Sequence, residues 1–89
     1  MTDRKAKVVI YSGRLCTYCN AAKRLLEKKG VAFEEIMIDT DASVRAEMEQ
    51  RSGRQSVPQI FIGDKHIGGF EQLRLINNDG NLDKLILED

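Results

Sequence analysis

The hydrophobic pattern of this chain alternates between strand-like and helix-like segments. A continuous apolar run over residues 8–11 predicts a strand that is buried on both faces. Over residues 17–29, apolar positions recur every three or four residues opposite a charged face, which predicts a helix, and Gly30 follows where a C-cap is expected. Residues 33–38 mix aromatic, acidic and β-branched side chains and predict a second strand. The first half therefore begins with strand, helix and strand.

The next segment predicts a polar helix and a β-hairpin. Residues 39–41 are Asp-Thr-Asp and offer turn and N-cap oxygens to a helix that runs to about Ser52. Two short runs, the apolar Ile60-Phe61-Ile62 and the mixed Lys65-His66-Ile67, stand on either side of Gly63-Asp64. Because Gly followed by Asp suits a two-residue turn, the two runs predict a hairpin.

The C-terminal part predicts two short helices docked on a sheet. Leucine and isoleucine recur over residues 73–76 and 82–86, and the polar residues 77–81 interrupt the pattern. A βαβ unit followed by a ββα unit predicts an α/β protein with a four-stranded mixed sheet, which has a right-handed parallel crossover and then an antiparallel hairpin. This arrangement is the thioredoxin fold, with helices flanking the sheet.

Composition and charge exclude several functions. The 89 residues are 42% hydrophobic, enough for a single core, so we expect one domain over residues 1–89. Lys and Arg total 14, as do Asp and Glu, so no net field favours nucleic acid or an anionic membrane. The apolar runs are too short for a membrane span, and residues 1–7 are too polar for a signal peptide, so we expect a cytoplasmic protein.

The only two cysteines stand three positions apart in Cys16-Thr17-Tyr18-Cys19, between the first predicted strand and the first predicted helix. A helix start offers unpaired backbone N–H groups and the positive end of the helix dipole, so it stabilises a thiolate, the form that attacks disulfides. We therefore assign Cys16 as the nucleophile. Cys19 lies one turn further along, shielded from outside partners but able to attack a mixed disulfide on Cys16, and is assigned as the resolving thiol.

The cysteine pair could also be a chance motif, two buried structural thiols or half of a zinc site. Zinc would need about four ligands, and His66 is the only histidine, so we expect no metal site and treat His66 as a solvated hairpin residue without a role. In a reducing compartment two cysteines favour a transient disulfide over a permanent one. The sequence thus favours redox chemistry.

Four motifs resemble the glutaredoxin family in its short, dithiol, bacterial type. The resemblance extends from Val8 to about Leu85. The motifs, in chain order, are Cys16-Thr17-Tyr18-Cys19, Ser52-Gly53-Arg54-Gln55-Ser56-Val57-Pro58-Gln59-Ile60-Phe61-Ile62, His66-Ile67-Gly68-Gly69 and Asn81-Leu82-Asp83.

The resemblance implies a glutathione site around the cysteines. Pro58 would be a cis-proline that faces the active site, and Val57 would turn its backbone N–H and C=O toward the cysteine part of glutathione, as in strand pairing. Tyr18 would line the groove with its ring. Arg54 and Gln55 resemble the positions that reach the glycine carboxylate.

The segment Gly69-Phe70-Glu71 resembles the part of the family site that holds the γ-glutamyl end of glutathione. There, backbone N–H groups at a helix start bind the carboxylate, and an acidic side chain meets the ammonium. Purely structural roles stay open for these residues. Phe70 and Tyr18 are equally suited to the core, and Glu71 to complementing the helix dipole.

Two positions depart from the family pattern. Many relatives carry Lys where this chain has Gly13, and we take the adjacent Arg14 as a partial substitute in binding glutathione. Thr17 replaces the usual proline between the cysteines. Some relatives with a small hydroxyl residue there assemble a [2Fe–2S] cluster between two subunits, with the first cysteine and glutathione as ligands, so a cluster remains an alternative.

The implied activity is that of a glutathione-dependent thiol–disulfide oxidoreductase in cell redox homeostasis. It would act on protein–glutathione mixed disulfides and protein disulfides through Cys16 and Cys19, as a monomer with glutathione as co-substrate and no tightly bound cofactor. An iron–sulfur carrier and a non-catalytic interaction module are two competing function classes. The intact cysteine pair argues against the module.

Overall fold

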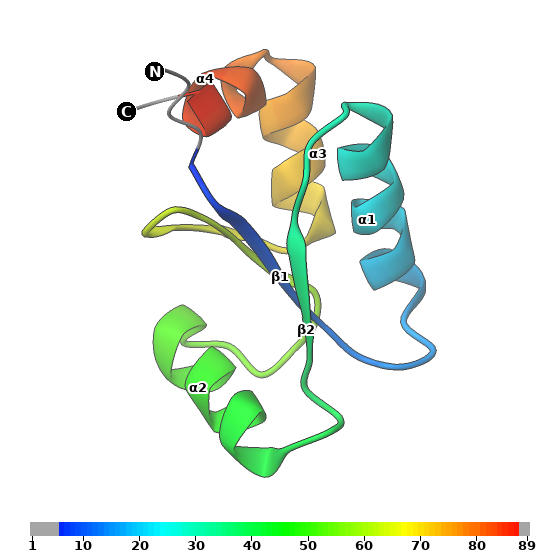
Figure 1. Ribbon diagram of the computed structural model, residues 1–89, viewed down its shortest axis with the longest axis vertical. Coiled ribbons are helices and arrows are strands. Elements are labelled where there is room, and N and C mark those ends of the chain that lie inside the picture. The colour runs from blue at the N-terminus through cyan, green and yellow to red at the C-terminus, as the bar shows by residue number, and fades with distance from the viewer. Residues whose placement is uncertain (1–5, 88–89) are drawn as a thin grey trace.

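The computed structural model describes residues 6–87, in which four strands form one mixed sheet (Figure 1). The strands are β1 (Val8–Ser12), β2 (Glu34–Met37), β3 (Gln59–Ile62) and β4 (Lys65–Gly68). Their order in the sheet is β2-β1-β3-β4. β1 pairs in parallel with β2 and antiparallel with β3, which pairs antiparallel with β4. The predicted parallel crossover and hairpin are therefore confirmed.

Four helices complete the described part of the chain, and their ends differ slightly from the predicted ones. The helices are α1 (Thr17–Lys28), α2 (Ala42–Ser52), α3 (Phe70–Asn78) and α4 (Asn81–Leu87). α1 ends one residue early because Lys29 forms its C-cap and Gly30 turns away with a φ of 73°. α3 continues into the expected break as far as Asn78, and Gly80 takes a φ of 86° before α4 begins.

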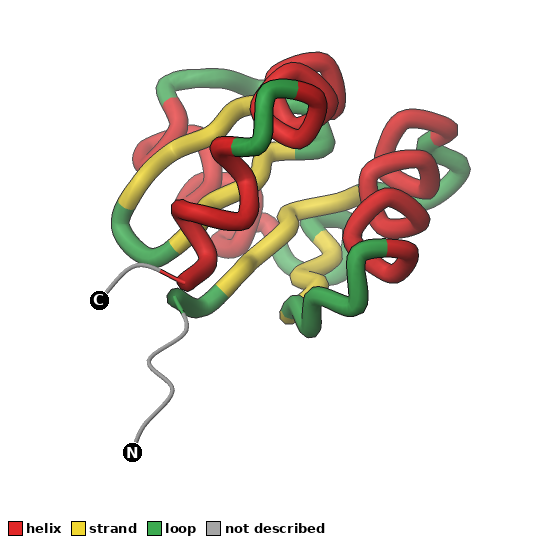
Figure 2. The backbone as a smooth tube through the Cα atoms, turned by 90° about the horizontal axis from the view of Figure 1, so that it is seen from above, coloured by secondary structure: helices red, strands yellow, loops and turns green. Residues whose placement is uncertain are grey.

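The sheet separates two layers of helices, with α2 on one side and α1, α3 and α4 on the other (Figure 1). Seen from above, the yellow strands run through the middle of the molecule with red helices around them (Figure 2). Strand residues alternate between the two faces. On β1, Val8 and Ile10 face the three-helix layer, whereas Tyr11 packs with Met48 of α2.

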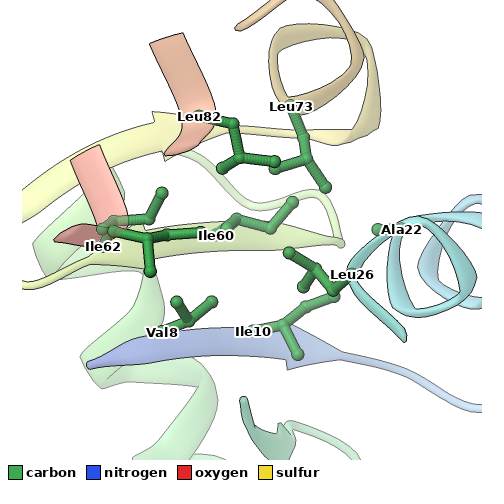
Figure 3. Close-up of a cluster of buried hydrophobic side chains, with 9 residues drawn as sticks. Val8, Ile10, Ala22, Leu26, Ile60, Ile62, Leu73 and Leu82 are labelled. Atoms are coloured by element: carbon green, nitrogen blue, oxygen red, sulfur yellow. The ribbon is translucent and has the colours of Figure 1, made fainter. Parts of the chain in front are cut away.

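The larger core lies between the sheet and α1, α3 and α4. Figure 3 shows Leu73 and Leu82 above Ile60 and Ile62 of β3, while Leu26 reaches in beside Ile10. The buried members of this cluster are Val8, Ile10, Ala22, Leu26, Ile60, Ile62, Leu73, Leu82 and Ile86.

The strand register brings two distant loops together. Tyr11, near the end of β1, lies opposite Gln59, the first residue of β3. Because the two strands are antiparallel, the loop that leaves β1 and the loop that enters β3 meet at the same end of the sheet. The first loop leads to the cysteines and the second contains Pro58.

No helix within residues 6–87 is long and apolar enough to cross a membrane.

Candidate active site

The two cysteines occupy different environments at the start of α1. Cys16 is the N-cap residue of the helix, and its Sγ accepts a hydrogen bond from the Cys19 backbone N–H at 3.1 Å. Cys16 is partly exposed, whereas Cys19 is only 1% exposed. The pair forms a disulfide with its Cα atoms 5.2 Å apart. The predicted helix-start position of Cys16 and the shielding of Cys19 are both confirmed.

The loop that enters β3 lies against the cysteines. The Val57-Pro58 peptide bond is cis, as expected from the resemblance. The Val57 carbonyl oxygen lies 3.9 Å from Cys16 Sγ, which puts the backbone of this loop within reach of a molecule bonded to that sulfur. Pro58 is buried and Val57 is partly buried.

The loop before Cys16 is fixed through its backbone. The Arg14 N–H donates a hydrogen bond to Asp39 Oδ2 at 2.6 Å, and the Arg14 side chain is exposed. Leu15 takes a φ of 55°, in the left-handed region that non-glycine residues rarely adopt. Its side chain is fully exposed next to Cys16. The sequence did not indicate the Asp39 contact, because it joins residues 25 positions apart.

Tyr18 and Phe70 form one wall of the site. Their rings stack with centroids 6.0 Å apart at an interplanar angle of 28°. Tyr18 is 62% exposed, so the alternative that it belongs to the core is wrong, whereas Phe70 packs against the core at its edge. The stacking brings the start of α3 beside the start of α1, although the two segments are far apart in the chain.

The start of α3 is partly occupied by its own side chains. Gly69 is the N-cap residue, and its N–H donates to Gln72 Oε1 at 2.8 Å. Glu71 is exposed, and its Oε1 accepts a hydrogen bond from Arg74 at 2.7 Å. An anion that binds at this helix start would therefore use the N–H groups beyond Gly69 or displace Gln72.

Arg54 and Gln55 lie exposed in the loop between α2 and Pro58. Gly53 ends α2 with a φ of 72°, and the Arg54 N–H then donates to Ser52 Oγ at 3.0 Å. These backbone contacts set the direction in which the loop leaves the helix.

Residues 8–67 match the family model described as Glutaredoxin, and the matched segment contains the cysteine pair, the cis-proline and the hairpin except for its last residue, Gly68. The chain belongs to the glutaredoxin family. It is 51% identical to Glutaredoxin 3 of Escherichia coli (strain K12) over 81 residues, which cover 91% of this chain and 98% of that protein.

Solved structures agree with the family assignment. The solution structure of a glutaredoxin from Brucella melitensis matches with a TM-score of 0.83 and 44% identity, over 93% of this chain and 90% of that one. The crystal structure of a buckwheat glutaredoxin–glutathione complex matches with a TM-score of 0.83 and 31% identity, over 91% and 76% of the two chains. This bacterial-type glutaredoxin is a glutathione-dependent thiol–disulfide oxidoreductase with a Cys16/Cys19 redox pair.

Two more features bear on where the chemistry of this glutaredoxin takes place. Among residues 6–87, no group of three or more His, Cys, Asp or Glu side chains is arranged to hold a metal ion. A hollow of about 530 Å³ lies at the opposite end of β1, between Val8, Val31 and Ile86. It is lined by neither cysteine, so we place the reaction at the cysteine loop, where the thiol and the polar backbone meet.

Proposed function

We propose that this glutaredoxin reduces protein–glutathione mixed disulfides with Cys16 as the nucleophile. The observation that carries the proposal is the asymmetry of the cysteine pair. Cys16 reaches the surface and its sulfur accepts a backbone N–H at a helix start, whereas Cys19 is 1% exposed. An N–H donor and a helix N-terminus both favour the thiolate, and only an accessible thiolate can attack an outside disulfide.

The proposed reaction runs in two exchanges. The Cys16 thiolate attacks the glutathione sulfur of the mixed disulfide, a Cys16–glutathione disulfide forms, and the protein leaves as a thiolate that takes up a proton. A second glutathione, as its thiolate, then attacks the glutathione sulfur on Cys16. Oxidised glutathione leaves, and Cys16 returns as a thiolate.

Protein disulfides follow a second route that needs both cysteines. The Cys16 thiolate attacks one sulfur of the substrate disulfide, and the Cys19 thiolate then displaces the substrate as a dithiol. The Cys16–Cys19 disulfide that results is reduced by two glutathione molecules. Glutaredoxins have potentials of about −200 to −230 mV, near that of the glutathione pool, so the exchanges run in either direction.

The proposed glutathione groove lies between the cis-proline loop and the Tyr18–Phe70 wall. The Val57 backbone, beside Pro58, would pair with the cysteine part of glutathione, because the Val57 oxygen is 3.9 Å from Cys16 Sγ. The stacked rings of Tyr18 and Phe70 would border the peptide. The buckwheat complex, a relative at 31% identity with bound glutathione, supports a site of this kind.

Charged groups would hold the two ends of glutathione. We assign the γ-glutamyl end to Gly69 and Glu71 at the start of α3, and the glycine carboxylate to Arg54 and Gln55 in the exposed loop before the proline. Arg14 would add a positive charge next to Cys16. Bidentate and charge-assisted hydrogen bonds of this kind are the strongest available to a small peptide.

We further propose that the protein works in the cytoplasm as a monomer and takes glutathionylated or disulfide-bonded proteins as substrates. A glutathione-bridged [2Fe–2S] dimer remains the competing hypothesis, because Thr17 replaces the usual proline and one thiolate per chain is enough for it. Visible absorbance and dimerisation of the freshly purified protein would favour the cluster. A colourless monomer that turns over glutathione would favour the enzyme alone.

The deciding experiment measures turnover of a glutathionylated peptide, coupled through glutathione reductase to the loss of NADPH. We expect activity to disappear in Cys16→Ser and to persist in Cys19→Ser, because only Cys16 is needed for the first route. Cys19→Ser should lose the reduction of protein disulfides. An inactive wild-type protein, shown by thiol titration to be reduced, would refute the proposal.

A further inference from the structure

Gln59, the first residue of β3, is a buried polar side chain next to the active-site loop. It is only 1% exposed. Its Nε2 donates to the Ser56 carbonyl oxygen at 3.0 Å, and its Oε1 lies 2.7 Å from His66 Nε2. One amide group therefore joins β4 to the residue that precedes Val57.

The chemistry of Ser56 and His66 determines which group donates in each of these two hydrogen bonds of Gln59. A backbone carbonyl only accepts hydrogen bonds, so the amide NH₂ of Gln59 must face Ser56. The amide oxygen is then left facing His66, and His66 must carry a proton on Nε2 to donate to it. The Ser56 carbonyl thereby determines the orientation of the Gln59 amide, and His66 completes the contact as the donor to its oxygen.

The His66 imidazole and the Arg51 guanidinium both lie against the Phe61 ring. The imidazole is 4.9 Å from the Phe61 ring, and the Arg51 guanidinium is 4.1 Å from the centroid of that ring. Partial desolvation, together with the positive charges of Arg54 and Arg51, keeps the pKa of His66 below its ordinary value. Both the neutral Nε2–H form and the imidazolium donate through Nε2, so the contact with Gln59 does not depend on titration.

His66 as a whole is exposed, as expected for a solvated hairpin position, but its Nε2 makes a specific contact with the buried Gln59 side chain. No local pattern around His66 indicates this contact, because Gln59 lies on the neighbouring strand. A role for His66 therefore follows from the pairing of β3 with β4.

We propose that Gln59 and His66 form a positioning pair that sets the backbone of Val57 for glutathione. The Ser56 carbonyl and the Val57 N–H belong to one planar peptide group, in which they point in opposite directions. Holding the carbonyl oxygen therefore fixes the direction of the N–H as well. This inference rests on the proposed function, in which the Val57 backbone pairs with the cysteine part of glutathione.

The test compares variants in the KM for a glutathionylated peptide. His66→Phe keeps an aromatic ring packed against Phe61 but removes the Nε2 donor, so the buried Gln59 oxygen loses its His66 partner. We expect its KM to rise about three- to tenfold, as for the loss of one hydrogen bond, with little change in kcat. His66→Gln, which keeps a donor, should recover part of the loss. The alkylation rate of reduced Cys16 by iodoacetamide should stay unchanged, because the thiol itself is not altered.

Two further variants address the pairing and the stability of the fold. The single variant Gln59→Leu should raise the KM. The double variant with His66→Phe should have the same KM as Gln59→Leu, since both substitutions break the same contact. Asp41→Ala removes the N-cap of α2 and destabilises the helix at the end opposite to the one that leads into the Ser56 loop. Its KM should be that of the wild type, and an equal rise there would overturn the proposal in favour of general loosening.

Tyr18→Leu separates this inference from the proposed function. A raised KM in Tyr18→Leu with a wild-type KM in both His66→Phe and Gln59→Leu would refute the positioning pair alone. If the KM rose in none of the three variants, the proposed groove and the positioning pair would both be refuted.

Discussion

At the scale of single residues, Glu71, which we propose binds the ammonium of glutathione, already has a partner in the structure. Its carboxylate is 2.7 Å from Arg74 Nη2 in an exposed ion pair. Exposed pairs of this kind contribute about 0–1 kcal/mol, so the ammonium of glutathione has little to displace. The alternative role, complementing the dipole of α3, requires no ligand.

Substitutions at both ends of this pair distinguish the two roles. We expect Glu71→Gln to raise the KM for a glutathionylated peptide several-fold, because the ammonium loses its carboxylate. Arg74→Met should leave the KM unchanged or lower it by up to about fivefold, the equivalent of an exposed ion pair. Both effects should shrink at high salt. A Glu71→Gln variant with the wild-type KM would assign the residue to the helix dipole only.

At the same scale, the sequence predicts the cysteine roles but not the surroundings of Tyr18. The Cys16–Cys19 spacing and the helix start are local properties of a few consecutive residues, and both appear in the structure. Whether an aromatic ring is buried depends on what packs against it. For Tyr18 the partner is Phe70, which lies in α3, far along the chain, and Tyr18 stays 62% exposed.

At the scale of secondary structure elements, Glu35 ties β2 to β1 and α1. Its Oε2 accepts hydrogen bonds from Ser12 Oγ at 2.6 Å and from Lys23 Nζ at 2.8 Å. The hydrogen bond from Lys23, which has the larger effect, and the one from Ser12 lower the pKa of Glu35 below its ordinary value. The unfolded chain therefore binds the proton more readily, so this contribution to stability is present above the ordinary pKa and is lost as the pH falls through the folded value.

The pH dependence of Glu35→Gln tests this linkage. At pH 7 the variant should have a free energy of unfolding lower by about 1 kcal/mol or less, because the pair is partly exposed. The difference from the wild type should begin to shrink as the pH falls below about 4.3, the ordinary pKa of Glu, and should vanish only below the lowered pKa of Glu35 in the folded protein. Urea unfolding at pH 7, 5 and 3.5 measures it. Glu34→Gln is the control, since its pair with Lys7 is well exposed and should contribute less. A difference as large at pH 3.5 as at pH 7 would contradict the assignment.

At the scale of the whole molecule, α4 completes the larger core with its buried residues Leu82 and Ile86. Leu82 is 0% exposed within that core, whereas Leu87 at the other end of the same helix is 61% exposed. A small domain has a total stability of about 5–15 kcal/mol. One buried leucine therefore represents a large share of it.

The two leucines form a matched pair of tests. Leu82→Ala should lower the free energy of unfolding by about 2–5 kcal/mol, because it leaves a cavity among β3 and the helices. Leu87→Ala should change it by less than about 0.5 kcal/mol. Urea unfolding at pH 7 measures both. Similar losses in the two variants would show that α4 is not docked as described.

The sequence by itself determined the elements and the reacting atoms of this protein. Four patterns are local to their own segments, where backbone geometry and side-chain size act directly. They are the apolar run of 8–11, the helical period of 17–29, the Asp41 cap and the Gly63 turn. The cysteine spacing is equally local. The parallel crossover and the hairpin follow from the order of the elements.

Tertiary structure alone decided the adjacency of β1 and β3, the meeting of the cysteine loop with Val57, and the exposure of Tyr18. It also decided the contact of Gln59 with His66. No pattern over a few residues carries this information, because each of these contacts requires two segments to be brought together by packing. A hydrogen bond or a stacked ring depends on both partners, and the sequence around either one describes only half of it.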